Sequence, residues 1–314
     1  DSGCLLEAQQ LVDRRGYLDE HSWNSLVQGY NECGNSEHAF KLYEMMQEQF
    51  VHTRRYILMA LLKTFSSLEC LEKGQELHAK IVKEGFEKDL FFCNTLLDMY
   101  LKTDCVIEAQ DIVDEQPLKD IVLWGTLING YTELGLYEEA LKCWDQIVLE
   151  GMGPDAVVSI CILKVCSALG DLERGWDVHR VIVEKMLEKE PMIGNALVHM
   201  YAKCGSLEDS QEVFDNLPFR DVVAWTSLIT GYAEHGLGEQ VLHGFQKMQQ
   251  DGIPLTSATL VSSLRACTIL EAIDKGRTVH AEIAQEGYEE DAFVCSALVD
   301  MYAKCGSLEE ARDI

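Results

Sequence analysis

The chain has 314 residues, of which 47% are hydrophobic, and its 26 basic and 53 acidic side chains give a formal net charge of −27 at pH 7. This acidic balance is the opposite of the basic surface that non-specific nucleic-acid binders present. No run approaches the roughly 18 apolar residues of a membrane span, and no signal-peptide pattern opens the chain. The sequence therefore indicates neither membrane insertion nor a secretory leader.

A block of 101 residues recurs along the chain with almost no slippage. Five residue types keep this spacing over three copies: Trp23, Trp124 and Trp225; Tyr30, Tyr131 and Tyr232; Gly74, Gly175 and Gly276; His78, His179 and His280; Met99, Met200 and Met301. A fixed period is typical of a solenoid, in which each unit buries its apolar face against its neighbours. We therefore expect a stacked array and not a fold built around one pocket.

Each block divides into segments of 35, 35 and 31 residues. In chain order, the segments are a tail at 1–19, then 20–54, 55–89, 90–120, 121–155, 156–190, 191–221, 222–256, 257–291 and a truncated 292–314. The chain thus starts and stops inside a segment. We expect it to be part of a longer protein, whose targeting peptide is not present in this sequence.

The first kind of segment predicts two helices, most clearly at 222–256. Apolar residues with the spacing of one helical face are Trp225, Leu228, Ile229, Tyr232 and Ala233, followed by Val241, Leu242, Phe245 and Met248. Gly236 ends the first run and Gly252 ends the second. Proline is scarce and no alternating strand pattern appears, so the sequence predicts an all-α array of antiparallel helix pairs.

The other two kinds of segment carry their own signatures. Segment 257–291 contains Leu260, Leu264, Cys267 and Leu270, followed by Gly276 and His280. Segment 191–221 contains the run NALVHMYAKCGSLE from Asn195, which returns as SALVDMYAKCGSLE from Ser296. A weaker copy lies at 90–120.

Twelve cysteines and nine histidines raise the question of a metal or catalytic site. No CxxC occurs, and Cys166/Cys267 and Cys204/Cys305 follow the 101-residue period, so we expect reduced, buried thiols. His280-Ala-Glu imitates the HxE of zinc deaminases, but its repeat equivalents at His78 and His179 lack the glutamate. We expect no metal, no cofactor, no small-molecule substrate and no enzymatic activity.

The segments resemble the pentatricopeptide repeat family, specifically its plant-type array of P, L and S repeats. The motifs that carry the resemblance are WTSLITGY from Trp225 in a P repeat, GRTVH from Gly276 in an L repeat and MYAKCGSLEEA from Met301 in an S repeat. The P repeats are 20–54, 121–155 and 222–256; the L repeats are 55–89, 156–190 and 257–291; the S repeats are 90–120, 191–221 and the partial 1–19 and 292–314. Tetratricopeptide repeats would show a uniform 34-residue step. The resemblance implies an α-solenoid of helix-turn-helix repeats that forms a superhelix.

The resemblance also implies that the array reads single-stranded RNA at about one base per repeat. In the family, the reading residues occupy the fifth and last positions of a repeat. These are Asn24 with Arg54, Asn94 with Asp120, Gly125 with Asp155, Asn195 with Asp221, Thr226 with Thr256, and Ser296 alone. Asn with Asp is the family's uridine pair, Asn24 would favour a pyrimidine, and Thr226 a purine. Arg54, Gly125 and Thr256 depart from the usual pairs.

The second position of each P and S repeat is expected to pack on a base face. These positions hold His21, Phe91, Val122, Met192, Val223 and Phe293. Family comparison makes Lys102, Lys203 and Lys304 phosphate contacts, but the P repeats carry Glu32, Glu133 and Glu234 at that place, so this segment alone should bind RNA weakly. The L repeats carry Met59, Ile160 and Val261 at the fifth position, and we expect them not to read bases.

An alternative role for several of these residues is helix capping. Asp120, Asp155, Asp221 and Asp291 each precede an expected helix, where a carboxylate satisfies free N–H groups and meets the positive end of the helix dipole. Asn at a helix start can do the same, and capping and base reading can coexist.

The function implied by the resemblance is sequence-specific recognition of single-stranded RNA in a mitochondrion or chloroplast. The P, L and S triplets are similar to those of factors that direct cytidine-to-uridine RNA editing. In such systems small accessory proteins (MORF/RIP-like) are expected to bind the L repeats. The alternative is a protein-interaction solenoid whose L repeats dock a partner and whose RNA binding is weak or depends on that partner.

Overall fold

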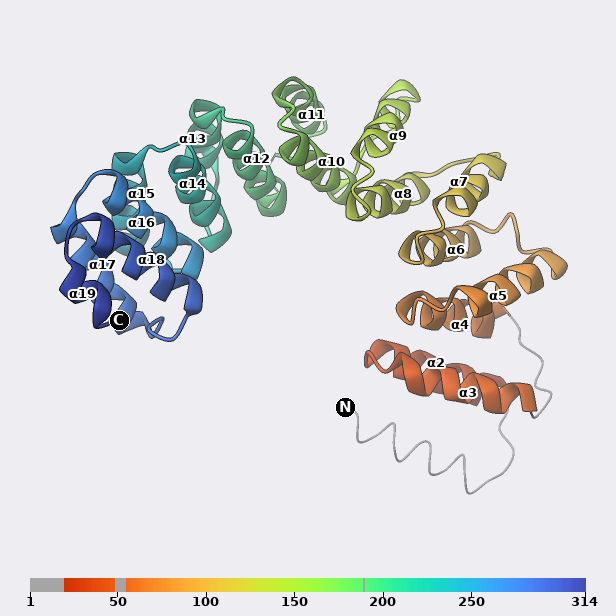
Figure 1. The fold of residues 1–314 in the computed structure, drawn as a ribbon. Helices are drawn as coiled ribbons and strands as arrows, with labels where there is room; N and C mark the ends of the chain where they lie inside the picture. Colours follow the sequence, from red (N-terminus) through yellow and green to blue (C-terminus); the bar gives the residue numbers. More distant parts are fainter. Residues whose placement is uncertain (1–19, 49–54, 189) are drawn as a thin grey trace. The chain divides into compact units, whose positions relative to one another are not determined.

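The computed structural model describes residues 20–48, 55–188 and 190–314, and all of their regular structure is helical (Figure 1). The chain forms two compact units, residues 1–154 and 155–314. The helices of the first unit are α2 (Glu20–Glu32), α3 (Ser36–Glu48), α4 (Arg55–Ser67), α5 (Leu71–Lys83), α6 (Leu90–Lys102), α7 (Val106–Glu115), α8 (Ile121–Glu133) and α9 (Tyr137–Leu149). Those of the second unit are α10 (Ala156–Leu169), α11 (Leu172–Glu184), α12 (Pro191–Lys203), α13 (Leu207–Asn216), α14 (Val222–Glu234), α15 (Gly238–Gln250), α16 (Ser257–Ile269), α17 (Ile273–Glu286), α18 (Ala292–Lys304) and α19 (Leu308–Arg312).

The apolar faces predicted from the periodicity form the core. In α14, Trp225, Leu228 and Ile229 are buried, and in α15 so are Val241 and Met248. Burying a side chain of this size stabilises the folded state by about 1.5–3 kcal/mol. The all-α prediction is confirmed over the described residues.

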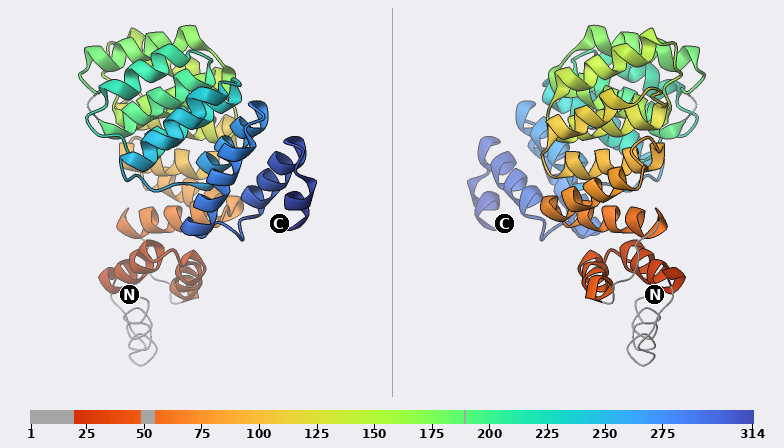
Figure 2. Two further views of the ribbon diagram at one scale, coloured as in Figure 1. Left: turned by 90° about the vertical axis from the view of Figure 1, so that its left-hand side faces the viewer. Right: turned by 90° about the vertical axis from the view of Figure 1, so that its right-hand side faces the viewer.

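Each unit contains two layers of helices (Figures 1 and 2). We call the even-numbered helices the first helices and the odd-numbered helices the second helices. First helices pack against one another in series, α2 to α8 in the first unit and α10 to α18 in the second. Each second helix packs on its own first helix and, in most segments, also on the next one. Because neighbours flank the inner first helices of each unit, namely α4, α6, α12, α14 and α16, about half or more of their residues are buried.

The repeating Gly and Met positions form one close contact, made three times. A Cβ atom on Gly74, Gly175 or Gly276 would lie 2.5 Å from the Sδ atom of Met99, Met200 or Met301, respectively. Each glycine lies on a second helix, and its methionine lies on the following first helix. The 101-residue spacing of both residue types therefore reflects packing between neighbouring segments.

The repeating histidines also have a packing role. Nδ1 of His78, His179 and His280 lies 2.8, 2.7 and 3.0 Å from the hydroxyl of Tyr100, Tyr201 and Tyr302, respectively. Each pair also makes an edge-to-face ring contact. His280 thus joins two helices in the same way as its repeat equivalents, as its place in the 101-residue pattern indicates.

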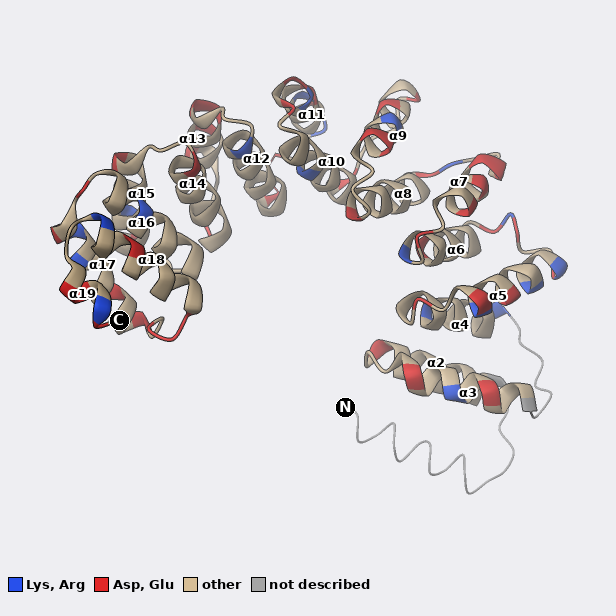
Figure 3. Ribbon diagram, viewed as in Figure 1, with Lys and Arg blue, Asp and Glu red and all other residues tan. Residues whose placement is uncertain are grey.

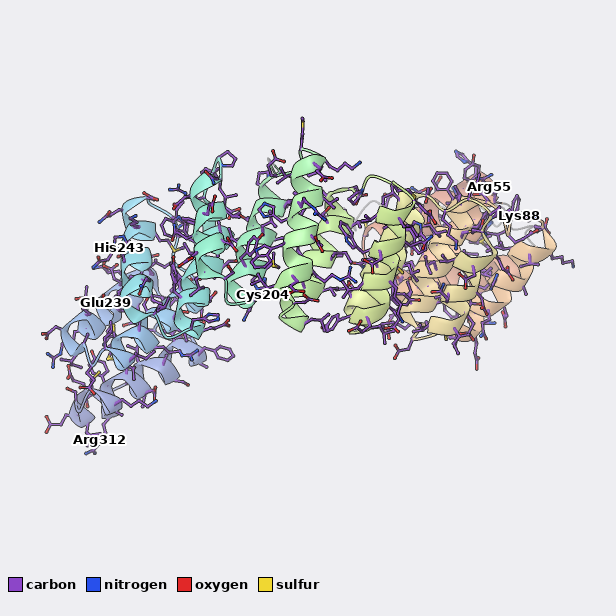
Figure 4. The ribbon with its side chains drawn as sticks, turned by 90° about the horizontal axis from the view of Figure 1, so that it is seen from above. Arg55, Lys88, Cys204, Glu239, His243 and Arg312 are labelled. Atoms are coloured by element: carbon purple, nitrogen blue, oxygen red, sulfur yellow. The ribbon has the colours of Figure 1, made fainter. Side chains whose placement is uncertain are left out.

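The cysteines described by the structure are free thiols; five of these eleven are buried, five are half-buried and Cys33 is exposed, so the expectation of buried thiols holds only in part. Burial raises the pKa of Cys166 to about 12 and that of Cys267 to about 11, which keeps these thiols protonated at neutral pH. The Sγ atom of Cys204 (Figure 4) lies 3.5 Å from the carbonyl oxygen of Cys166, and Cys305 makes the corresponding contact with Cys267 at 3.9 Å. These cysteines follow the repeat because they pack between segments.

No group of His, Cys, Asp and Glu side chains among the described residues is arranged to hold a metal ion. No helix among them has the length and apolar character needed to cross a membrane.

The contact between α12 and α14 gives a test of this packing. A Cβ atom on Gly231 would lie 2.5 Å from the Cβ atom of Ala202, and neither atom can rotate away. Glycine-to-alanine changes inside helices normally stabilise by about 0.5–1 kcal/mol. We expect Gly231→Ala instead to destabilise by about 1–3 kcal/mol because it overpacks the interface. The double variant Gly231→Ala/Ala202→Gly moves the methyl group from one helix to the other and should restore most of the wild-type midpoint of urea unfolding. A double variant as unstable as Gly231→Ala would contradict the contact.

The half-buried histidines His78 and His179 predict a pH dependence of stability. Burial lowers the pKa of His78 and His179 below the ordinary value, so the unfolded chain binds protons more readily than the folded one. Their contribution to the free energy of unfolding is therefore fully present above about pH 6.5 and is lost as the pH falls below that value. The thermal midpoint should decrease from about pH 7.5 to about pH 5. His78→Gln/His179→Gln should flatten this decrease, and an unchanged slope would contradict the assignment.

Candidate nucleic-acid interface

A row of exposed apolar side chains marks the second position of the first helices. The predicted stacking residues are all exposed, with exposed fractions that reach 66% at Phe91 and 79% at Phe293. They are His21, Phe91 and Val122 in the first unit, and Met192, Val223 and Phe293 in the second. Exposed aromatic and large apolar side chains at a repeated place are available to contact a flat ligand such as a base.

The segments predicted as L repeats, 55–89, 156–190 and 257–291 (called the L segments below), continue this row, although only the P and S positions were predicted to stack on bases. Tyr56 on α4 has an exposed fraction of 71%, and Val157 on α10 one of 58%. Ala258 on α16 is also exposed. All three occupy the second position of their segment, so the same spacing could have identified them from the sequence.

One predicted base-reading pair forms a direct contact. Asn195 is half-buried on α12, and its Nδ2 atom donates to Oδ1 and Oδ2 of Asp221 at 3.1 and 2.9 Å. Asp221 also accepts the backbone N–H groups of Val223 and Ala224, both at 2.9 Å, at the start of α14. Asp221 therefore caps a helix and orients the Asn195 amide at the same time.

The other predicted pairs differ from this arrangement. The hydroxyl oxygens of Thr226 and Thr256 lie 3.4 Å apart. Asn94 is half-buried, and its Oδ1 atom is buried without a hydrogen-bond partner, whereas Asp120 caps α8 through the N–H of Leu123 at 2.8 Å. An orphaned buried acceptor of this kind is costly unless a ligand satisfies it.

The remaining predicted positions are less informative. Asn24 is half-buried on α2, and its predicted partner Arg54 lies outside the described residues. Gly125 is buried and offers no side chain, whereas Asp155 caps α10 through the N–H of Val158 at 2.9 Å. Ser296 is exposed on α18, where its hydroxyl donates to the carbonyl of Ala292 at 2.7 Å.

The predicted capping role is confirmed. Besides Asp120, Asp155 and Asp221, Asp291 accepts the N–H groups of Phe293 and Val294 at 2.9 and 3.1 Å. These hydrogen bonds lower the pKa of Asp291 and keep its carboxylate charged.

The three lysines predicted to contact phosphate are all ion-paired. Lys102 pairs with Asp98 and Lys304 with Asp300, both at 2.9 Å and one turn earlier on the same helix. Lys203 pairs with Glu234 on the next first helix. Glu234 is one of the glutamates that the sequence places in register with the lysines. Such exposed pairs are weak, but each lysine would have to leave a carboxylate to bind a phosphate.

The acidic charge is concentrated on the second helices (Figure 3). In the described chain, the first helices carry seven Lys or Arg and six Asp or Glu, a net charge of +1. The second helices carry 11 Lys or Arg and 25 Asp or Glu, a net charge of −14. The first helices themselves are thus nearly neutral, although the whole chain is strongly acidic. The capping aspartates just before them, Asp89, Asp120, Asp155, Asp221 and Asp291, are not part of this count and add five negative charges to the same layer.

A groove of about 550 Å³ lies on the first-helix layer of the first unit. It is lined by side chains from α2, α4 and α6, among them Asn24, Gln28, Tyr56, Met59 and Lys63. The groove brings together an exposed ring, amide groups and two lysines, which are groups that contact bases and phosphates, and it also contains the carboxylates of Glu32 and Asp98.

Comparison with known proteins identifies the family. The PPR repeat family matches residues 21–49, 122–152, 195–221, 223–253 and 293–314. A pentatricopeptide repeat-containing protein of Arabidopsis thaliana is 33% identical over 310 residues, which are 98% of this chain and 43% of the relative. A second relative from that plant, named as mitochondrial, is 30% identical, and the match covers 99% of this chain and 30% of the relative. A third, named as chloroplastic, is 31% identical, and the match covers 98% of this chain and 36% of the relative. The chain spans less than half the length of these relatives.

Solved structures show the same fold. The crystal structure of the maize pentatricopeptide repeat protein PPR10 matches with a TM-score of 0.82 at 22% identity, over 98% of this chain and 45% of that one. PPR10 in complex with an 18-nt psaJ RNA element matches with a TM-score of 0.78 at 22% identity, over 98% and 46%. The repeat matches and the relatives show that the chain belongs to the pentatricopeptide repeat family, and the solved structures show that it has the α-solenoid fold.

The two hydrogen-bonding roles of Asp221 can be separated by stability measurements. We expect Asp221→Ala to destabilise the chain by about 1 kcal/mol because α14 loses its cap. Asp221→Ser should recover most of this loss, since serine also caps. Asn195→Ala should cost less than Asp221→Ala because the cap remains. If urea unfolding shows equal losses for Asn195→Ala and Asp221→Ala, the amide is a structural element and not a free reading group.

Proposed function

We propose that this array recognises single-stranded RNA base by base across its first-helix layer. The observation that carries the proposal is the row of exposed apolar side chains at the second position, directly beside the fifth-position side chains. The complex of PPR10 with RNA supports the same use of this fold. RNA sequence recognition by repeat arrays places one base against each repeat.

The Asn195–Asp221 contact supports a preference for uridine. Because the Nδ2 atom of Asn195 donates to the Asp221 carboxylate, its Oδ1 atom is left as an acceptor. Uracil presents an N–H donor at ring position 3, whereas cytosine presents an acceptor there. The oriented amide thus matches uridine and disfavours cytidine.

We further propose that the array has the P, L and S organisation and serves as the specificity segment of an organellar cytidine-to-uridine editing factor. The family matches fall in five of the predicted P and S segments, and none falls within 55–89, 156–190 or 257–291; the predicted S segment 90–120 is also unmatched. This distribution is expected if the L segments diverge from the common repeat. The mitochondrial and chloroplastic names of two relatives support an organellar location.

A second candidate function is docking of a protein partner on the L segments. Trp176 and Val183 on α11 each have an exposed fraction of 49%, and Met186 follows at 77%. This apolar patch lies on a second helix, away from the predicted reading residues. Binding of a MORF/RIP-like accessory protein there would be compatible with RNA binding on the first helices.

RNA selection tests the proposed function. The 314-residue chain would be incubated with randomised single strands at low salt, and the retained RNA sequenced. We expect enrichment of uridines three nucleotides apart, because the two Asn–Asp repeats are three repeats apart. The double variant Asn94→Thr/Asn195→Thr should abolish this enrichment. Each hydrogen bond lost to a base should weaken RNA binding by about 1 kcal/mol, or roughly fivefold in affinity.

The matched control is Asn35→Thr/Asn216→Thr, which makes the same chemical change at exposed positions outside the first helices. It should leave the selected sequences unchanged. Retention of RNA without any uridine pattern would contradict base reading. No retention at low salt would favour the protein-docking function.

A further inference from the structure

The first helices of the L segments bury all but a narrow stripe. On α4, Tyr56, Lys63 and Ser67 are exposed and Met59 is half-buried, which is the spacing of one helical face. The helices α10 and α16 repeat this pattern with Val157, Ile160 and Lys164, and with Ala258, Val261 and Arg265. Each L segment thus presents an apolar second position, an apolar fifth position and a cation at the ninth position.

These three cations differ from all other Lys and Arg side chains of the first helices. In the described chain, the others are Arg55, Lys102, Lys203 and Lys304, and each forms an ion pair; Arg55 (Figure 4) pairs with Asp89 at 2.6 Å. Lys63, Lys164 and Arg265 are exposed and form no ion pair with any described residue. They are therefore the free positive charges of an otherwise compensated layer.

The surroundings of these cations favour a polyanion that also carries flat apolar groups. Lys63 lines the same groove as Tyr56, whose ring is largely exposed. The fifth positions Met59, Ile160 and Val261 offer no hydrogen-bonding group for a base edge. These segments can therefore hold a ligand by charge and stacking, but they cannot distinguish one base from another.

We infer that Lys63, Lys164 and Arg265 bind the RNA phosphates, so that the L segments supply sequence-independent affinity while the P and S segments read bases. This inference rests on the proposed RNA-binding function. The cations recur every third segment, so at one nucleotide per segment they would meet every third phosphate. The ion-paired lysines of the S segments then have a minor role in binding.

Salt-dependent RNA binding tests the inference. Lys63→Gln/Lys164→Gln/Arg265→Gln would be compared with wild type on a uridine-containing strand and on a randomised strand. Each phosphate contact on single-stranded RNA contributes about 0.7 to the slope of log affinity against log salt concentration. The triple variant should lower that slope by about 2. It should weaken binding to both strands by the same factor.

Two controls separate this effect from net charge and from folding. Lys142→Gln/Lys247→Gln/Lys275→Gln removes the same charge from exposed positions on second helices and should leave the slope unchanged. Lys63→Arg/Lys164→Arg keeps the charge and should retain the wild-type slope. Thermal unfolding should be similar for all variants, because the substituted side chains are exposed.

The outcomes distinguish the inference from the function on which it rests. Wild-type binding with an unchanged slope in the L-segment variant would overturn the inference and leave base reading intact. If the L-segment triple variant and the second-helix control variant changed the salt slope equally, the effect would be one of general charge, and the inference would also be overturned. Absence of wild-type RNA binding at low salt would overturn both proposals.

Discussion

The packing of each first helix between its neighbours determines what this protein can present to a ligand. Segment-to-segment contacts such as Gly175 against Met200 and Gly231 against Ala202 leave no room for even one added carbon atom. Because two sides of the helix are covered by neighbours and a third by the second helix, only one stripe remains open. Positions two, five and nine lie on that stripe, so any chemistry repeated along the array has to be placed there.

The distribution of charge between the two layers reconciles a net charge of −27 with the proposed RNA binding. Acidic side chains occupy the second helices, where solvent screens them. The first helices are close to neutral, and three of their carboxylates, Asp98, Glu234 and Asp300, form ion pairs with lysines, while the aspartates just before the helices act as caps. Among the described first helices, the cations without an ion pair are those of the L segments. Under the proposed function, the segregation of charge between the two layers would therefore matter more for RNA binding than the total charge.

The helices and the exposure of the stacking positions follow from the sequence, because the 101-residue period records contacts that every block repeats. The pairing of Lys203 with Glu234 was not predicted, since the two residues are 31 positions apart and meet only through helix packing. Lys63, Lys164 and Arg265 were missed because the period was sought in residue identity, whereas this position keeps only its charge. The different states of Asn94 and Asn195 could not be predicted, because identical residue pairs are oriented by small differences in packing.

Photo-crosslinking tests the central claim that RNA lies along the first-helix stripe. Single-stranded RNA containing a photoreactive uridine analogue would be crosslinked to the 314-residue chain at low salt, and the modified residues identified by mass spectrometry. The account predicts crosslinks at Tyr56, Phe91, Met192 and Phe293, on first helices of both units. Crosslinks confined to second helices, for example at Trp176, would contradict it.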